Sequence, residues 1–340
     1  MTLGESASLR HLHPQSIRRY QPRPQEMHEV VQLLRRIGHT DLLRPPGVDK
    51  LQEVARSVPP DLKREIHSVR NGRSGVLVLS LKDCLPEPPR TPRHWKDVCN
   101  GQLAPQYDSL LVLLCSVLGE VFRWSTQQDG RLVHDALPIR GHEYEQLGTS
   151  SMVDLNWHTE DAFHEHRADY VGLLCVRNVD CVATSVCCAD WLEISRADAE
   201  VLRSPRYVIR PDNSHLPRYN STDIDTTSFG EIAALKESPS RVAVLFGSHQ
   251  SPRIRVDRDF VTPVDGDDDA SAALGRLNRN IERNLVDVRL KAGELCILDN
   301  HRVVHGRRAF SPRYDGTDRW IKQCNTRALV LRGHDTVTGL

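Results

Sequence analysis

The feature that most constrains the fold is a change in the pattern of the chain near residue 131. From there onward, short β-rich runs are separated by turns. The runs are expected to form strands at 132–139, 170–177, 182–188, 207–209, 242–246, 253–256, 286–290, 294–298, 302–304 and 320–331. Because strands and helices do not alternate regularly, a Rossmann fold or a TIM barrel is disfavoured. The pattern predicts a mainly β fold with α additions, whose core is a distorted double-stranded β-helix, or jelly roll.

The N-terminal part of the chain has a helical pattern instead. Apolar residues recur at helical spacing in 27–37 and again in 48–58, where Pro59 and Pro60 end the pattern. The run 107–124 is apolar around most of its circumference, which predicts a helix packed against the main sheet. A helical N-terminal buttress is therefore expected beside the β core.

These patterns predict a single domain over residues 1–340. Its parts are a mostly helical stretch at 1–125 and a jelly-roll core at 126–332, with lid segments at about 210–235 and 261–285. The second lid segment includes a helical pattern at 271–285.

Composition excludes several classes of protein. Lys+Arg and Asp+Glu both number 45, so no basic field would gather nucleic acid. No apolar run approaches the roughly 18 residues of a membrane span, and the N-terminus lacks the apolar core of a signal peptide. Nine cysteines without a CxxC pair argue against a disulfide framework or a zinc ribbon. A cytoplasmic protein with neither nucleic acid nor membrane as a partner is expected, and a homodimer is left open.

A candidate metal site comes from histidines and one carboxylate. His158 and Glu160 form a His-x-Glu pair, and on a strand the two side chains would point to the same face. A distant histidine, His305, would complete a two-histidine, one-carboxylate triad. Such a triad leaves positions open on one face of Fe(II), as an oxygenase needs. In a chain with 16 histidines the pair alone is weak evidence, because a chance match is about an even bet.

Arg319 strengthens this interpretation. It lies downstream of His305 in the string DGTDRW, where β-rich sequence resumes. A guanidinium is a natural clamp for the distal carboxylate of 2-oxoglutarate. The strings WHTEDAFHEHRADYVGLLCVRN, LDNHRVVHGRRAF and DGTDRW resemble those of the clavaminate synthase-like Fe(II)/2-oxoglutarate oxygenases. The chain is most similar to the bacterial arginine hydroxylases of peptide-antibiotic biosynthesis, of the viomycin and capreomycin type, from about residue 124 to 320.

The resemblance implies Fe(II), 2-oxoglutarate as cosubstrate and O₂, with His158, Glu160 and His305 as both the catalytic residues and the iron ligands. It also implies that Arg319 holds the C5 carboxylate of 2-oxoglutarate and that Thr184 donates to it. The free oxygen of Glu160 would face the amino group of the substrate. The remaining implied substrate contacts are Gln127 at the amino-acid head, and Asp212 and Ser214 in a substrate lid.

Asp257 and Asp259 are candidate anchors for a guanidinium. Their spacing puts them on one face of a strand, where paired carboxylates could make charge-assisted bonds, and the arginine hydroxylases resemble this pattern. Arg253 and Arg258 lie beside them and could neutralise them instead. Aspartates that cap a turn at a strand end are the ordinary alternative.

The predicted function is hydroxylation of a free amino acid, L-arginine or a close guanidino derivative, at C3 or C4 in natural-product biosynthesis. Desaturation or ring closure of the same substrate, and reaction of citrulline, lysine, a cyclised arginine or a carrier-tethered amino acid, stay open. A catalytically silent β-barrel binding module is the alternative from another class.

Overall fold

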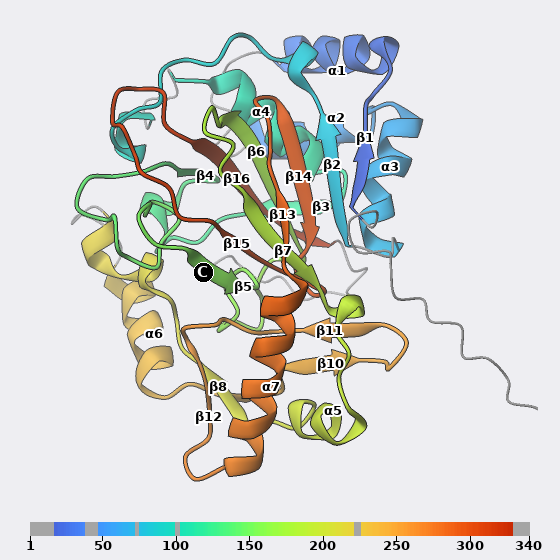
Figure 1. Cartoon of the computed structure of the whole chain (residues 1–340). Coiled ribbons are helices and arrows are strands. Elements are labelled where there is room, and N and C mark those ends of the chain that lie inside the picture. The colour runs from blue at the N-terminus through green and yellow to red at the C-terminus, as the bar shows by residue number, and fades with distance from the viewer. Residues whose placement is uncertain (1–16, 38–46, 72–74, 99–102, 221–225, 329–340) are drawn as a thin grey trace, which may run out of the picture.

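The computed structural model describes residues 17–37, 47–71, 75–98, 103–220 and 226–328 (Figure 1). The helices are α1 (Pro24–Ile37), α2 (Gly47–Ala55), α3 (Pro60–Asn71), α4 (Pro105–Cys115), α5 (Arg196–Leu202), α6 (Thr226–Glu237) and α7 (Asp268–Asn284). The strands are β1 (Arg18–Tyr20), β2 (Val76–Ser80), β3 (Gly119–Phe122), β4 (Val133–Ala136), β5 (Leu155–His158), β6 (Tyr170–Arg177), β7 (Thr184–Cys188), β8 (Tyr207–Ile209), β9 (Arg241–Val242), β10 (Leu245–Gly247), β11 (Pro252–Ile254), β12 (Val261–Pro263), β13 (Val286–Val288), β14 (Glu294–Asp299), β15 (Val303–Arg307) and β16 (Trp320–Ala328).

Two sheets organise the molecule. The larger has seven strands, in the order β1-β2-β14-β6-β16-β3, with β4 also paired to β16. The smaller has four strands, in the order β13-β7-β15-β5. A three-stranded sheet (β12-β8-β9) and the β10-β11 hairpin lie beside α5 and α7 in the lower part of Figure 1. The prediction of a mainly β fold with added helices is confirmed.

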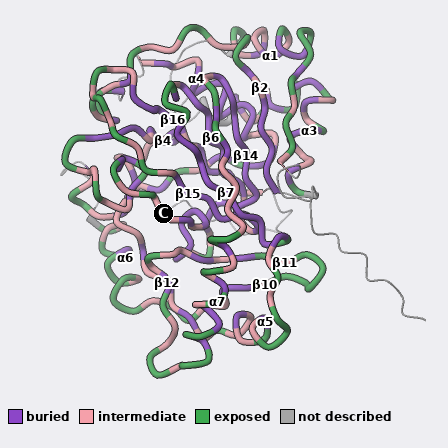
Figure 2. Tube along the Cα trace, in the orientation of Figure 1, coloured by how far each residue is buried: buried purple, intermediate pink, exposed green. Residues whose placement is uncertain are grey.

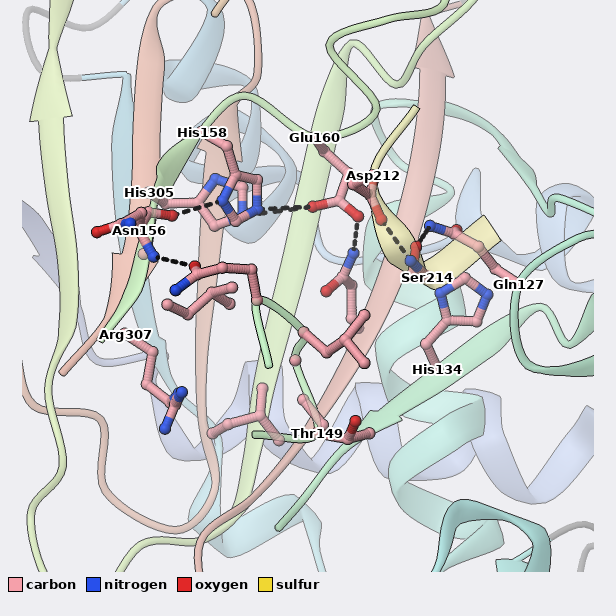
Figure 3. A pocket seen from close by; sticks show the side chains of 18 of the residues that line it. Gln127, His134, Thr149, Asn156, His158, Glu160, Asp212, Ser214, His305 and Arg307 are labelled. Carbon is pink, nitrogen blue, oxygen red and sulfur yellow. Dashed lines mark hydrogen bonds and ion pairs between the residues drawn. The ribbon is translucent and has the colours of Figure 1, made fainter. Parts of the chain in front are cut away.

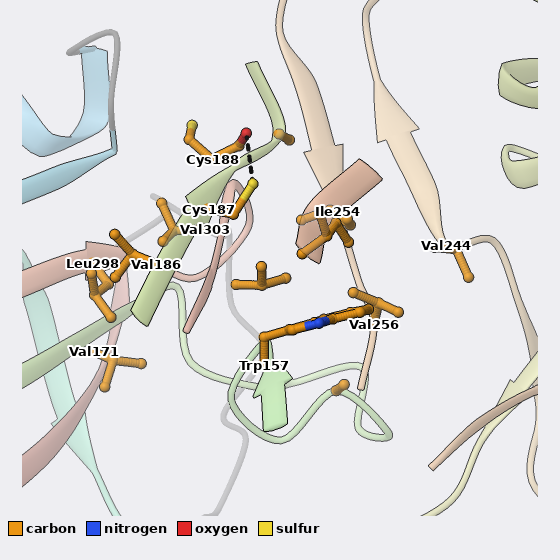
Figure 4. Close-up of a cluster of buried hydrophobic side chains, with 14 of the residues drawn as sticks. Trp157, Val171, Val186, Cys187, Cys188, Val244, Ile254, Val256, Leu298 and Val303 are labelled. Atoms are coloured by element: carbon orange, nitrogen blue, oxygen red, sulfur yellow. Dashed lines mark hydrogen bonds between the residues drawn. The ribbon is translucent and has the colours of Figure 1, made fainter. Parts of the chain in front are cut away.

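Alternation along the central strands produces two hydrophobic cores. On β6 and β14, Leu174 pairs with Leu295, and both belong to a core shared with helices α1–α4. Val171 pairs with Leu298, and both face the other core, which contains Val186 of the smaller sheet (Figure 4). Successive side chains of a strand point to opposite faces, so one strand serves both cores. The buried residues accordingly concentrate along the central strands in Figure 2.

The predicted helix at 107–124 is wrong in its second half. Helix α4 ends at Cys115, and Gly119–Phe122 forms strand β3, which pairs with β16. A Cβ at Gly119 would lie 2.0 Å from the carbonyl oxygen of Arg327, so only glycine allows this close approach of the two backbones. A continuous apolar run does not distinguish a buried helix from a buried strand. Helix α4 does pack against the main sheet, on β6 and β16.

A buried ion cluster joins α4 to this sheet. Lys322 of β16 is fully buried, and its Nζ lies 2.7 Å from an oxygen of Asp108 on α4 and 2.9 Å from one of Asp135 on β4. Asp135 also pairs with Arg131 at 2.6 Å. Because Lys322 points toward the helices, its neighbour Gln323 points to the opposite face of the sheet, where the site described below lies.

The two segments predicted as lids differ in their surroundings. Asp212 and Ser214, from the first segment, line the pocket that holds the site described below, whereas no residue of 261–285 does so. Helix α7 instead contributes Ala273, Leu277 and Ile281 to the second core. Among the described residues, no helix is long and apolar enough to cross a membrane. The described cysteines are all unpaired.

Candidate active site

His158, Glu160 and His305 converge at one place. Strands β5 and β15 pair antiparallel with His158 directly opposite His305, and their ring centroids lie 4.6 Å apart. Glu160 follows the end of β5, and its Oε2 lies 3.7 Å from Nε2 of His158 and 3.4 Å from Nε2 of His305 (Figure 3). The potential ligand atoms lie within 4.8 Å of one another. The sequence prediction that these side chains meet therefore agrees with the geometry.

The donor set fits a ferrous ion. The Nδ1–H of His158 donates to the carbonyl oxygen of Asn156 at 2.8 Å, which leaves Nε2 free as a ligand. Burial opposes ionisation of Glu160, but hydrogen bonds from His158 and His305 outweigh it and hold the pKa of this carboxyl well below its usual range. Burial likewise opposes a charge on His158, yet Glu160 and Asp257 raise its pKa to about 10. A divalent cation at the same atoms would displace that proton, as metal binding to imidazole requires.

Two amides support Glu160 from outside this triad. Asn300 accepts from the backbone N–H of Glu160 at 2.7 Å and donates to its carbonyl oxygen at 3.0 Å. Gln323 donates to Oε1 of Glu160 at 2.7 Å, so Oε2 is the oxygen directed at the histidines. The oxygen that the resemblance assigned to the substrate's amino group thus already accepts one hydrogen bond. Neither amide was predicted from the sequence, although Gln323 lies two strand periods beyond Arg319 and this spacing was a usable signal.

Arg319 is a buried cation without a carboxylate partner among the described residues. It is 6% exposed, its Nη2 donates to Oγ1 of Thr184 at 3.2 Å, and its buried Nε has no hydrogen-bond partner in the described chain. Burial lowers the pKa of Arg319 to about 10. A guanidinium in such a place calls for a bound anion. The predicted pair of Arg319 and Thr184 is therefore brought together, and its role in binding a dicarboxylate stays a prediction.

The predicted contacts to the amino-acid head also lie together. Nε2 of Gln127 donates to Oγ of Ser214 at 2.8 Å, and Oδ1 of Asp212 accepts from the backbone N–H of Ser214 at 2.7 Å (Figure 3). All three residues line the same pocket as Glu160. The predicted head-group site is thus continuous with the candidate metal site.

Asp257 and Asp259 line the pocket, but the prediction that they share a strand face is wrong. Residues 257–260 form a turn in which Oδ1 of Asp257 accepts from the backbone N–H of Asp259 at 3.0 Å. Asp259 is exposed and accepts from Nδ2 of Asn156, whereas the backbone of Asp257 forms an isolated antiparallel β-bridge with that of His158. The turn-capping alternative therefore holds for Asp257, because a short side chain that bonds its own backbone stabilises a turn.

The carboxylates of Asp257 and Asp259 are not neutralised by the arginines that lie beside them in the sequence. Among the described residues, no arginine or lysine forms an ion pair with Asp257 or Asp259, and Arg258 pairs with Glu282 at 3.4 Å. Burial raises the pKa of Asp257 to about 7. Among the described residues, the acidic groups at this end of the pocket thus have no arginine or lysine partner, and Arg319 has no carboxylate partner.

The chain belongs to the taurine catabolism dioxygenase TauD, TfdA family, whose model matches residues 113–325. Among its relatives is the L-ornithine/L-arginine 3-hydroxylase of Catenulispora acidiphila, 41% identical over 243 residues, which cover 69% of this chain and 71% of the relative. The enduracididine beta-hydroxylase of Streptomyces hygroscopicus is 37% identical over 284 residues, 80% of this chain and 82% of that protein.

A similar solved structure is the non-heme iron oxygenase OrfP in complex with Fe, succinate and (3S)-hydroxy-L-Arg. It superposes with a TM-score of 0.82 at 35% identity and covers 91% of this chain and 94% of OrfP. OrfP has also been solved with Fe and alpha-ketoglutaric acid. The family that the sequence predicted, and the prediction that the chain is a dioxygenase, are confirmed.

Proposed function

We propose that this chain is an Fe(II)- and 2-oxoglutarate-dependent oxygenase that hydroxylates free L-arginine, or a close guanidino derivative, at C3. The observation that carries the proposal is the pocket itself. It joins a two-histidine, one-carboxylate cluster to a buried guanidinium without a carboxylate partner and to carboxylates without an arginine or lysine partner, among the described residues. The two facing sheets support a single double-stranded β-helix domain as the scaffold.

We assign separate residues to binding of iron and to binding of 2-oxoglutarate. His158, Glu160 and His305 would hold iron, which together with 2-oxoglutarate and O₂ supplies the oxidising chemistry. Arg319 and Thr184 would bind the far carboxylate of 2-oxoglutarate, because a buried cation gains most from an anion that water cannot screen.

The unpaired acidic groups favour a cationic amino acid. L-Arginine carries a guanidinium and an ammonium, both of which need acceptors. Asp212 and Asp257 line the pocket, and each accepts hydrogen bonds from the described residues through Oδ1 alone. Citrulline would leave a partly buried carboxylate without the counter-charge that arginine brings, which is costly. Anchors at both ends of the amino acid fix which carbon lies beside the iron. The relative named as an L-ornithine/L-arginine 3-hydroxylase favours C3 over C4.

The reaction is tested by a substrate screen. Purified protein with Fe(II), 2-oxoglutarate and ascorbate is expected to convert L-arginine to a product that is one oxygen heavier, with one succinate formed per product. Ornithine, lysine, citrulline and asparagine serve as competitors, and mass spectrometry also detects the loss of two hydrogens that desaturation would cause. Turnover of citrulline in preference to arginine would reject the proposed substrate. Absence of succinate with every amino acid would reject the proposed activity.

Asp257→Asn tests the guanidinium anchor. The variant keeps the size of the side chain but removes the charge, so the KM for arginine is expected to rise about 10- to 100-fold. The KM for 2-oxoglutarate should change less than about twofold, because Arg319 and Thr184 are untouched. Steady-state kinetics with each substrate varied in turn measure both values, and an equal rise in the two would contradict the assignment.

A pH profile provides the control for this anchor. The pKa of Asp257 is raised to about 7, so the carboxyl binds a cation above that pH and loses its charge below it. Between pH 8 and pH 6 the arginine Kd of the wild type should therefore increase by about tenfold. The Asp257→Asn variant has no such titration, and its arginine Kd should be nearly flat across the same range.

A further inference from the structure

Asp161, which directly follows Glu160, is buried and has no assigned role. It is 3% exposed and adopts a left-handed backbone with φ of 50°. Few residues other than glycine adopt this conformation unless the surrounding structure holds them there. Asp161 lies close enough to Asp212 and His215 to form a second group of potential metal ligands. However, its oxygens already accept N–H donors, which would oppose a cation, so a different role is needed.

The two oxygens of Asp161 serve different parts of the structure. Oδ2 accepts from Nε1 of Trp124 at 2.6 Å and from Nδ2 of Asn325 on β16 at 3.4 Å. Oδ1 accepts from Nε2 of Gln127 at 3.3 Å and from Nε2 of His215 at 3.1 Å. Oδ2 is thus tied to the frame of the fold, whereas Oδ1 is tied to groups on the substrate side of the pocket.

The contact with Gln127 decides which end of that amide is free. Its Nε2 donates one hydrogen to Oδ1 of Asp161. It donates the other to Oγ of Ser214 (Figure 3). Its Oε1 is buried and has no partner among the described residues. A flipped amide would lose the hydrogen bond to Asp161, because a carboxylate only accepts, whereas the Ser214 hydroxyl could donate to the amide oxygen instead. The amide oxygen remains available, and an ammonium group, which only donates, requires such an acceptor.

The contact with His215 fixes the neighbouring segment. His215 is fully buried, and its Nδ1 lies 2.7 Å from Oγ1 of Thr126. Five residues along, Nδ2 of Asn220 donates to the carbonyl oxygen of Thr126 at 2.8 Å. Residues 212–220, which carry Asp212 and Ser214, are therefore attached at two points to the region of Gln127. Asp161 connects this segment to the loop that carries Glu160.

We propose that Asp161 is a positioning residue for the amino group of the substrate. It acts by orienting the Gln127 amide so that its oxygen meets the ammonium, and by anchoring segment 212–220 through His215. This inference rests on the proposed function, because it assumes an α-amino acid in the pocket. Recognition of the substrate's amino group then depends on Asp161, although Asp161 does not touch that group.

Asp161→Asn is the direct test, with L-arginine compared to 5-guanidinopentanoic acid, which is arginine without its α-amino group. Calorimetry on the anaerobic enzyme with Fe(II) and 2-oxoglutarate measures both affinities. The variant is expected to weaken arginine binding by about 10- to 100-fold and binding of the analogue by less than about threefold. The 2-oxoglutarate affinity should be unchanged. A purely structural role predicts equal losses for both ligands, and that result would overturn the proposal.

Two further variants test the same proposal without changing Asp161, which lies next to Glu160 in the chain. His215→Phe retains a ring against Phe163, at a centroid distance of 4.9 Å in the wild type, but removes the donor to Oδ1. It should reduce the preference for arginine over the analogue by about tenfold. Trp124→Phe removes a donor to Oδ2 and should preserve that preference. Loss of the preference in Trp124→Phe but not in His215→Phe would contradict the division between the two oxygens.

Failure of the proposed substrate is distinguishable from failure of this inference. A wild-type enzyme that binds no arginine would reject the substrate assignment. The role of Asp161 is then tested with ornithine against 5-aminopentanoic acid, which differ in the same α-amino group. A variant that loses affinity equally for both members of that pair would reject the inference on its own.

Discussion

His305→Ala is expected to abolish substrate-dependent succinate formation, with a loss of about a thousandfold or more. The imidazole is one of two nitrogen ligands in the cluster, and its Nε2 lies 3.4 Å from Oε2 of Glu160. Removing it leaves His158 and Glu160, which cannot hold Fe(II) with the affinity and open geometry that the reaction needs. Iron titration and succinate assays measure both losses. Nδ1 of His305 has no hydrogen-bond partner among the described residues, so the contact with Glu160 is the side-chain interaction that the substitution removes.

His301→Gln is the matched control for this experiment. His301 lies in the same sequence motif, but its Nε2 contacts Asp169 at 2.6 Å, away from the cluster. Its replacement should leave the iron stoichiometry intact. Coupled turnover retained in His305→Ala, or iron lost equally in both variants, would contradict the assignment of His305 as a ligand.

Arg319→Met is expected to have opposite effects on ligand binding and on the stability of the apoprotein. Truncating one partner of a buried charge pair costs about 2–5 kcal/mol, so the Kd for 2-oxoglutarate should rise by about 30-fold or more. Without the ligand, the wild-type guanidinium is a buried charge, and its burial lowers its pKa to about 10. Replacing it with an apolar side chain removes that penalty, and the Tm of the apoprotein should rise.

Arg313→Ala provides the comparison for Arg319. Arg313 is a partly exposed arginine that pairs with Asp180 at 2.8 Å, and exposed ion pairs contribute about 0–1 kcal/mol. Its loss should change neither the 2-oxoglutarate affinity nor the Tm appreciably. Thermal shift measured with and without 2-oxoglutarate separates the two effects. A lower apoprotein Tm together with unaltered 2-oxoglutarate affinity in Arg319→Met would reject the proposed clamp.

Strand geometry explains why the metal site could be predicted. Side chains alternate along a strand, so His158 could be placed beside Glu160 from spacing alone, and three separated motifs pointed to one family. The same alternation would have placed Gln323 on the pocket face with Arg319. It failed for Asp257 and Asp259, because the chain turns at that point and turn hydrogen bonds override the strand period. It also failed for residues 107–124, where an apolar run suits a helix and a strand equally.

The amino-acid sequence by itself determined the class of fold, the three side chains that meet around the candidate metal position and the guanidinium set behind them. These features follow from local periodicity and from motifs that keep their order along the chain. The tertiary structure alone decided what supports them: Asn300 reaches Glu160 across 140 residues of chain, and Asp161 joins Trp124, Gln127, His215 and Asn325. Such hydrogen bonds between distant segments depend on how strands and loops pack, and no short-range pattern encodes them.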